Sequence, residues 1–373
     1  MTDFLKALSV FIGTVIGVGI FGLPFVAYQA GFLVVLLYFL LLTGVAVLIH
    51  LLFGKICLGT EGRHRLPGYV EMYLGPIWKK VVLVTGVVGI FGALLAYLIV
   101  GGEFLKLFFA PWLGGDLLLY VLVFFALGAY LIFKGIKSIS QIEVALLFVL
   151  FAILGLFFFR AVPFIDFDNF REVNLQFITF PYGVILFSLG GLSIVPEIKE
   201  MLNGDKEKTK KVIIWGILIS AIVYLIFIFL VLGASGPNTS KTGMAGFIET
   251  VGDGILLLSF LFGVITCFTS FLSVGLTLKK ILWLDFGVSK NLSWFITCFF
   301  PLAFFLLGFK EFIDIIGFTG AITIGIEGII IIFLYREFLE RKLSQRMNPW
   351  MYLLTLFFIL GIGFEIFYFF FVR

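Results

Sequence analysis

The chain has 373 residues, of which 62% are hydrophobic and 13% charged, with a mean hydropathy of +1.20 and a formal net charge of +4. This number of polar groups is too small to cover the surface of a soluble protein of this size. The composition therefore excludes a soluble protein and predicts a polytopic integral membrane protein. Cys57, Cys267 and Cys298 show no paired spacing, and His50 and His64 fit no ligand pattern and are expected at an edge and in a loop. The sequence therefore predicts neither a cofactor nor a metal site.

The first hydrophobic segment, residues 7–30, is interrupted by glycines at Gly13, Gly17, Gly19 and Gly22. Because every backbone N–H and C=O in lipid needs a partner, a span weakened in this way needs protein, ligand or ions to complete it. The N-terminus of a half-helix offers free N–H groups to an anion, and the unwound carbonyls beside it can hold a cation. We expect the chain to fold around this break. The alternative is that Gly13 and Gly17 only permit close packing of two helices.

Hydrophobic runs of roughly 20 residues, enough to cross a bilayer, continue along the chain and predict eleven spans. They lie near residues 7–30, 32–54, 81–109, 116–133, 142–162, 177–197, 212–234, 254–278, 292–308, 312–335 and 350–372. The first segment has no cleavage site of the signal-peptide type, and we expect it to be retained. The loops are short, and the longest, residues 54–80, is expected to contain an interfacial helix near Tyr69 to Tyr73.

Lysine and arginine gather in alternate connections between these spans. One set of connections, beginning with Lys6, contains 20 of the 26 basic residues, and the opposite set contains the other 6. Because basic residues concentrate in cytoplasmic loops, this asymmetry predicts a cytoplasmic N-terminus and an outside C-terminus, in a cell membrane.

The sixth span contains a second weak point. Ser188, Gly190, Gly191 and Ser193 lie near its middle, and Pro196 follows Gly191 by five positions, as Pro24 follows Gly19. Each break lies in the first span of a half that contains five spans. Because five is an odd number, the second half has the opposite orientation in the membrane to the first. Paired discontinuous helices in an inverted repeat are typical of secondary transporters that bind substrate between them. We expect one domain over residues 1–373, with repeats at about 5–162 and 175–335 and an additional helix at about 350–372.

The motifs in spans one, six and eight also carry a family resemblance. The segment Gly13-Thr-Val-Ile-Gly-Val-Gly-Ile-Phe-Gly-Leu-Pro24 resembles the first-helix signature of the amino acid, polyamine and organocation superfamily. Span six, ending in Pro196-Glu-Ile-Lys-Glu-Met, and span eight, with Thr269-Ser-Phe-Leu-Ser-Val-Gly-Leu, resemble the amino acid/auxin permease branch, including bacterial tyrosine and tryptophan permeases. The resemblance implies an all-α, LeuT-like fold with discontinuous helices 1 and 6, and ion-coupled symport of an amino acid into the cytoplasm.

Matched motif positions imply a substrate site between the two breaks. The substrate carboxylate would meet the backbone of Thr14, Gly17, Val18, Gly19 and Ile20. Facing that stretch would be Phe187, Ser188, Leu189, Gly190 and Gly191. A zwitterion that leaves water needs N–H donors for its carboxylate and oxygen acceptors for its ammonium, and paired broken helices supply both. Tyr97 on span three is a further candidate that caps the substrate, although a tyrosine in a span also serves as simple packing.

Two sites compete for the coupling ion, H⁺ or Na⁺. In relatives, hydroxyls at the positions of Thr269 and Ser270 bind sodium, whereas hydroxyls in membrane helices often only bond their own i−4 carbonyl. Glu327, between glycines in span ten, is the deepest acid and a candidate proton carrier, because ionisable groups inside a membrane are costly and usually functional. It could instead only bond a neighbouring helix. Glu103 and Glu143 lie nearer span ends, and Glu365 is expected to be structural.

Other classes fit less well. A membrane enzyme would need clustered acids, paired histidines or a nucleophile with its base, and the sequence shows none of these patterns. A channel does not need two matched broken helices, and a sensor of transporter ancestry stays open. We expect an amino acid and the lipid bilayer as partners, with no nucleic acid and no obligate protein partner.

Overall fold

The computed structural model describes residues 2–135 and 139–369, and every regular element in these ranges is helical. Among them, eight helices are long and apolar enough to cross a membrane, or nine if the bent pair α1 (Asp3–Val15) and α2 (Gly19–Ala30) is one span. Two shorter apolar helices are α13 (Lys290–Leu306) and α16 (Met351–Phe367). These elements coincide with the predicted segments, and the number that crosses the bilayer stays a prediction.

The remaining long helices follow the hydrophobic runs. They are α3 (Phe32–Gly59), α5 (Pro76–Leu113), α6 (Leu117–Lys134), α7 (Ile139–Ala161), α10 (Lys206–Ser235) and α12 (Leu256–Lys280). Span six is divided into α8 (Pro181–Ser188) and α9 (Val195–Met201). The tenth predicted span is α14 (Phe312–Phe318) and α15 (Gly325–Phe338), joined by the π-helical turn Thr319–Ile324, called η8.

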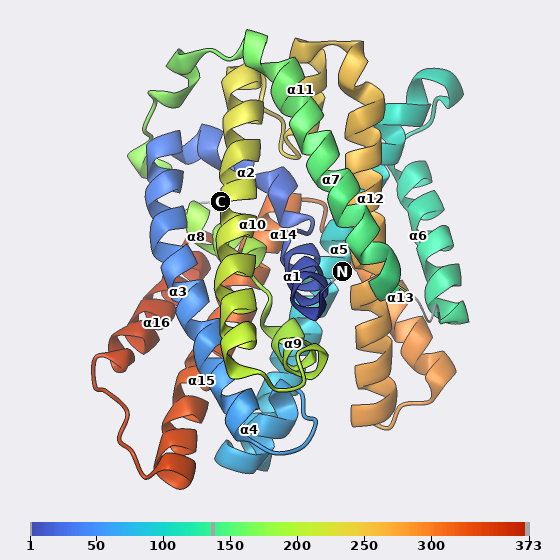
Figure 1. Cartoon of the computed structure of the whole chain (residues 1–373). Coiled ribbons are helices and arrows are strands. Elements are labelled where there is room, and N and C mark those ends of the chain that lie inside the picture. The colour runs from blue at the N-terminus through green and yellow to red at the C-terminus, as the bar shows by residue number, and fades with distance from the viewer. Residues whose placement is uncertain (1, 136–138, 370–373) are drawn as a thin grey trace.

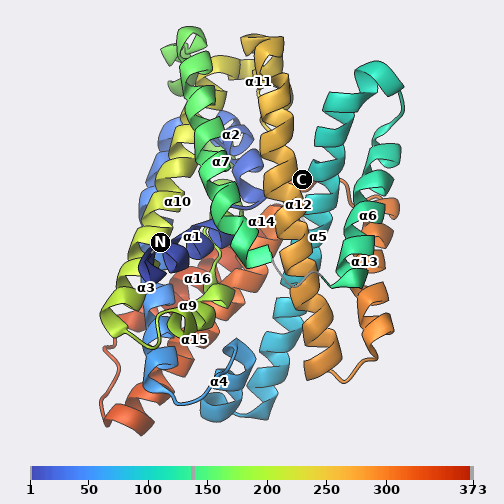
Figure 2. The same cartoon turned by 45° about the vertical axis from the view of Figure 1, so that its right-hand side comes forward.

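Two short helices mark the opposite ends of the bundle. α4 (Leu66–Leu74) lies at one end, and α11 (Met244–Val251) lies near the other (Figures 1 and 2). α4 confirms the short helix expected around Tyr69 to Tyr73. It starts with Pro67 in its first turn, where a missing N–H costs nothing, and it ends at Gly75, whose φ of 94° reverses the chain into α5.

The outward faces of the long helices are apolar. Leu40 on α3 is 67% exposed, Ile222 on α10 is 56% exposed and Leu353 on α16 is 66% exposed. Such a continuous apolar surface is unfavourable in water and suits the acyl chains of a bilayer. The chain is therefore an integral membrane protein.

The helices that position the centre of the bundle pack closely. α1 packs against α10 and α7, and α5 packs against α12, with α6 and α13 at the edge beside them (Figure 2). α8 crosses α14 and η8 where Gly183 meets the backbone of Gly317 and Gly320. Side chains at these glycines would separate the helices, so the glycine pairs fix the position of α8.

Candidate functional site

The first span is broken at the predicted place. α1 ends at Val15, α2 begins at Gly19, and the two axes differ by 53°. A Cβ on Gly17 would come within 2.6 Å of the Tyr97 hydroxyl, and one on Gly19 would overlap the side chain of Ser188. A Cβ on Gly13, by contrast, would meet no atom within 4 Å. Close packing therefore does not explain Gly13, and Gly17 and Gly19 are required where other groups approach the break.

The sixth span is broken as well. α8 ends at Ser188, Leu189 to Gly191 are not helical, and a 3₁₀ turn leads into α9, which has Pro196 in its first turn. The break occurs here because two successive glycines favour unwinding and the proline cannot donate to a preceding turn. The prediction of two discontinuous helices is confirmed.

The two breaks meet in the middle of the bundle. Gly19 lies against Ser188, and the Ser188 hydroxyl donates to the Val184 carbonyl at 2.8 Å. Tyr224 on α10, which is fully buried, places its hydroxyl 2.7 Å from the carbonyl oxygen of Val15 and 2.9 Å from that of Ser188. Sequence reasoning missed Tyr224, because nothing in the pattern of α10 distinguishes it from a packing residue.

A cavity of about 350 Å³ begins at the breaks. Most of the predicted substrate residues line it, together with the predicted proton carrier: Thr14, Gly17, Gly19, Tyr97, Phe187, Ser188, Gly190, Gly191 and Glu327. Val18, Ile20 and Leu189 do not line it with their side chains, which are buried in the core. Val18 and Ile20 were predicted to contribute through the backbone, and Leu189 to face that stretch, and these stay predictions.

The cavity continues toward the end of the bundle that carries α4. Its far wall includes Arg65, Pro67, Glu197, Thr277 and Ile281. Sequence reasoning did not assign these residues to the site. They come from three different segments of the chain that only the tertiary fold brings together.

The other side of the breaks is filled by aromatic side chains. Phe21 on α2 contacts Phe104 of α5 and Phe262 of α12 edge to face, with ring centroids 4.8 and 5.5 Å apart. Phe227 of α10 stacks on Phe262 at 5.6 Å, and all four rings are almost completely buried. Beyond this aromatic plug, an ion pair joins Lys241 to Glu311. Among the described residues, the cavity therefore extends from the breaks toward the α4 end, and phenyl rings fill the space toward the α11 end.

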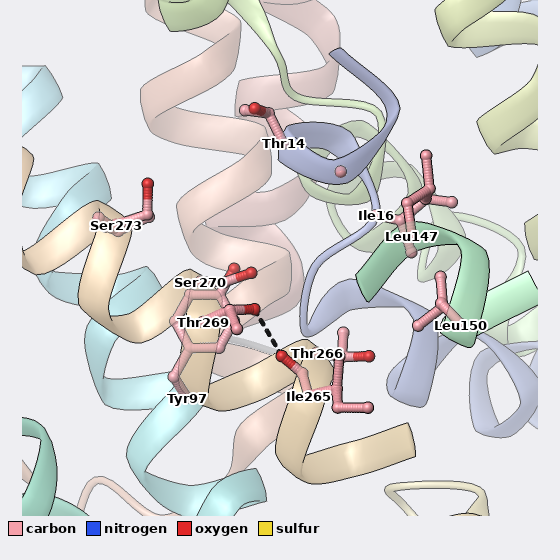
Figure 3. A pocket seen from close by; sticks show the side chains of 12 residues that line it. Thr14, Ile16, Tyr97, Leu147, Leu150, Ile265, Thr266, Thr269, Ser270 and Ser273 are labelled. Atoms are coloured by element: carbon pink, nitrogen blue, oxygen red, sulfur yellow. Dashed lines mark hydrogen bonds between the residues drawn. The ribbon is translucent and has the colours of Figure 1, made fainter. Parts of the chain in front are cut away.

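A second, smaller cavity of about 80 Å³ lies between the first break, α7 and α12 (Figure 3). Thr269 and Ser270 line it, as does Thr14. The Thr269 hydroxyl donates to the Ile265 carbonyl, as the alternative interpretation expected. Because that bond uses only the hydrogen, the lone pairs of the oxygen stay available to a cation. Thr266, one turn earlier, is 4% exposed and its hydroxyl has no hydrogen-bond partner among the described residues.

Glu327 is half-buried and faces α5. A Cβ on Gly86 would lie 3.8 Å from its carboxylate oxygen Oε1, and Thr323, one turn before Glu327, lies against Gly89. Gly86 and Tyr97 are eleven positions apart on α5, which corresponds to roughly 16 Å along a helix. Glu327 therefore shares the main cavity with the breaks but lies well toward its α4 end.

The other ionisable candidates are also placed. Glu365 is 8% exposed on α16 and lies outside both cavities, as expected for a structural role, and Glu103 is half-buried on α5. The side chain of Glu143 lies outside the described residues. The expectation that His50 occupies an edge is wrong. It is 3% exposed within α3, shares a hydrogen bond of 2.7 Å with the Ala46 carbonyl through Nδ1, and directs Nε2 toward Gly191. Hydropathy placed the end of span two several residues too early, because α3 runs on to Gly59.

Comparison with known proteins agrees with this architecture. The sequence profile of the tryptophan/tyrosine permease family matches residues 1–368. The chain belongs to the tryptophan/tyrosine permease family. It is 25% identical over 329 residues to "Tyrosine-specific transport system 1" of Haemophilus influenzae, covering 83% of this chain and 81% of that protein. It is 23% identical over 324 residues to "Glutamine transporter 2" of Aliivibrio fischeri, covering 84% and 83%.

Solved structures show the same fold at low identity. The structure of MhsT in complex with L-phenylalanine matches with a TM-score of 0.65 and 15% identity, covering 98% of this chain and 97% of that one. The inward-facing conformation of Mhp1 matches with a TM-score of 0.69 and 13% identity, covering 96% and 88%. The permease therefore has a LeuT-like fold, as the sequence motifs implied. Its family and its relatives place it among amino acid transporters and not among enzymes.

Proposed function

We propose that this permease is a secondary active transporter that imports an amino acid into the cytoplasm by alternating access, coupled to an ion. The observation that carries the proposal is the cavity that begins at two matched helix breaks and extends toward the α4 end, while buried phenyl rings fill the space on the other side of the breaks. A transporter needs a central site that is exposed to one side at a time, and an aqueous channel does not need a sealed side.

The substrate's charged groups match the breaks. Among the described residues, the N–H groups of Gly17, Val18 and Gly19 donate to no backbone carbonyl, whereas those of Ile20 and Phe21 donate to the carbonyls of Gly17 and Val18. Gly17 and Gly19 line the same cavity as Tyr97 and Phe187. We assign the carboxylate to Gly17, Val18 and Gly19, and the ammonium to the oxygens around Ser188. The Tyr97 ring then covers the substrate.

The orientation follows from the basic residues. Arg65 directly precedes α4, Lys79 lies in the first turn of α5 directly after α4, and Lys241 lies just before α11. α4 and α11 lie at opposite ends of the bundle (Figure 1). The positive-inside rule then makes the α4 end cytoplasmic and the C-terminus external. The cavity is therefore open to the cytoplasm, and the aromatic plug closes the outside. The two halves, at about 5–162 and 175–335, are expected to form the inverted repeat.

The coupling ion has two candidate sites. The small cavity presents hydroxyl oxygens of Thr14, Thr266, Thr269 and Ser270, and its described lining residues include no carboxylate and no basic side chain, which suits a monovalent cation such as Na⁺. Glu327 lies in the cavity that opens to the cytoplasm, where a carboxyl group can release a proton to water. A sodium gradient would use the first site and a proton gradient the second.

Uptake into proteoliposomes tests the proposal. Labelled tyrosine and glutamine, followed by a mixture of labelled amino acids, are offered under an imposed pH gradient, an imposed sodium gradient and no gradient. Accumulation under one gradient is expected and would identify the coupling ion. If folded protein neither accumulates nor exchanges any amino acid, the proposed function is wrong, and a sensory role gains support.

A further inference from the structure

Tyr224 occupies the junction between the two helix breaks. Its hydroxyl oxygen lies 2.7 Å from the Val15 carbonyl oxygen and 2.9 Å from the Ser188 carbonyl oxygen. Val15 is the last residue of α1 and Ser188 is the last residue of α8. The hydroxyl therefore joins two residues that are 173 positions apart, from the two halves of the chain.

The two carbonyls need a positive partner. A carbonyl in the last turn of a helix has no N–H one turn later, and the breaks remove that turn in both spans. Two such oxygens directed at one point repel each other unless something positive lies between them. In transporters built from broken helices, the C-terminal carbonyls of half-helices and unwound backbone coordinate the coupling cation.

In this chain the hydroxyl already fills that point. Tyr224 is 0% exposed, and one O–H hydrogen shared between two acceptors makes a three-centre bond. The ring lies beside Phe39 of α3, with centroids 6.2 Å apart, so the hydroxyl is supported by packing behind it. A metal ion at the same point would overlap the hydroxyl oxygen.

We propose that Tyr224 is a positioning residue whose hydroxyl takes the place of a coupling cation at the junction of the two breaks. The junction therefore binds no ion, which leaves the small cavity and Glu327 as the candidate sites for coupling ions. This inference rests on the proposed function, since it concerns the same substrate site. It adds an upper limit on the number of coupling ions and the group that holds the two half-helices in register.

Kinetics of substrate exchange test the positioning role. The full-length protein in proteoliposomes is compared as wild type, Tyr224→Phe and Tyr120→Phe. Tyr120 is a matched control, because its hydroxyl also donates to a backbone carbonyl, that of Gly114, near the end of α5 and far from the breaks. Tyr224→Phe removes the hydroxyl that joins α1 to α8, so the two half-helices can shift relative to each other. A smaller fraction of the protein is then competent to bind substrate. We expect KM to rise at least tenfold with Vmax changed less than threefold, and Tyr120→Phe to stay within twofold of wild type.

Ion stoichiometry is measured on the wild type and does not depend on a variant that folds. The membrane potential that just balances a known substrate gradient gives the number of ions moved with each substrate molecule. No more than two ions are expected, one for each remaining candidate site, and a value of three or more would overturn the proposal. A KM for Tyr224→Phe equal to that of Tyr120→Phe would overturn the positioning role. If the wild type exchanges no amino acid, the proposed function is wrong. If the wild type transports and Tyr224→Phe transports equally well, the proposed function stands and only the positioning role of Tyr224 is wrong.

Discussion

The two halves of the site, on either side of the helix breaks, are built from different chemistry. Toward the α11 end, Phe21, Phe104 and Phe262 exclude water with ring-to-ring contacts. Toward the α4 end, the cavity walls contain backbone at glycines, threonine hydroxyls, Arg65 and Glu197. Apolar rings can close a path without leaving polar groups unsatisfied, whereas a path for a zwitterion needs polar walls. The difference indicates that, in this conformation, the α11 side of the breaks is closed and the α4 side can admit a polar substrate.

The largest expected effect comes from the place where the two halves join. Gly19→Val puts a side chain against Ser188, whose Cα would lie 3.1 Å from the new Cβ, and it blocks the backbone from the carboxylate. We expect binding of labelled amino acid to fall below detection. Gly44→Val is the matched control, since a Cβ on Gly44 of α3 meets no atom within 4 Å. Unchanged affinity of the Gly19 variant would remove the central claim about the breaks.

At Glu327, in the cavity that extends toward the α4 end, we expect a substitution to reduce gradient-driven accumulation strongly and to leave exchange intact. If Glu327 carries the proton, Glu327→Gln should reduce accumulation driven by a pH gradient to the level of no gradient, while exchange continues. Exchange needs no net proton movement, so it separates the coupling role from loss of folding. Glu365→Gln, on a buried acid outside both cavities, is the control. Normal accumulation in the Glu327 variant would exclude this residue as the carrier.

A moderate effect is expected at the small cavity beside the breaks. If sodium is the coupling ion, Thr269→Ala removes one coordinating oxygen and should raise the sodium concentration for half-maximal uptake by roughly tenfold, the equivalent of one hydrogen bond to a charged group. Thr250→Ala removes a similar hydroxyl, bonded to the Gly246 carbonyl on α11, and should leave the sodium response unchanged. An equal response of the two variants would count against a sodium site at Thr269.

The smallest effect is expected beyond the aromatic plug. Lys241 and Glu311 are both about half exposed, and exposed ion pairs contribute about 0 to 1 kcal/mol. Lys241→Ala should therefore change KM and Vmax by less than about fivefold, the equivalent of that energy. A loss of transport comparable to that of Gly19→Val would mean that this ion pair, and not the phenyl rings, closes the outside.

Much of the centre of the fold was predictable, because local signals specify it. Each break contains glycines, at positions 17 and 19 or at 190 and 191, and is followed by a proline. These residues weaken a helix regardless of its neighbours, and both spans are broken there in the structure. The relative heights of the polar groups were not predictable. The sequence pattern assigns Glu327 to the site. The packing of α15 on α5, however, places Glu327 beside a position of α5 that is roughly 16 Å from Tyr97 along α5. His50 was misplaced for the related reason that hydropathy fixes the ends of a span only to within several residues.

The sequence by itself determined that this is a helical membrane protein, where its spans run and which two of them break, because hydropathy and backbone freedom are properties of neighbouring residues. Only the tertiary structure decided that Tyr224 joins Val15 to Ser188, that phenyl rings fill one side of the breaks, and that Thr269 and Glu327 line separate cavities. These features depend on contacts between helices far apart in the chain. Such contacts are set by the packing of all the helices together, and no local pattern records them.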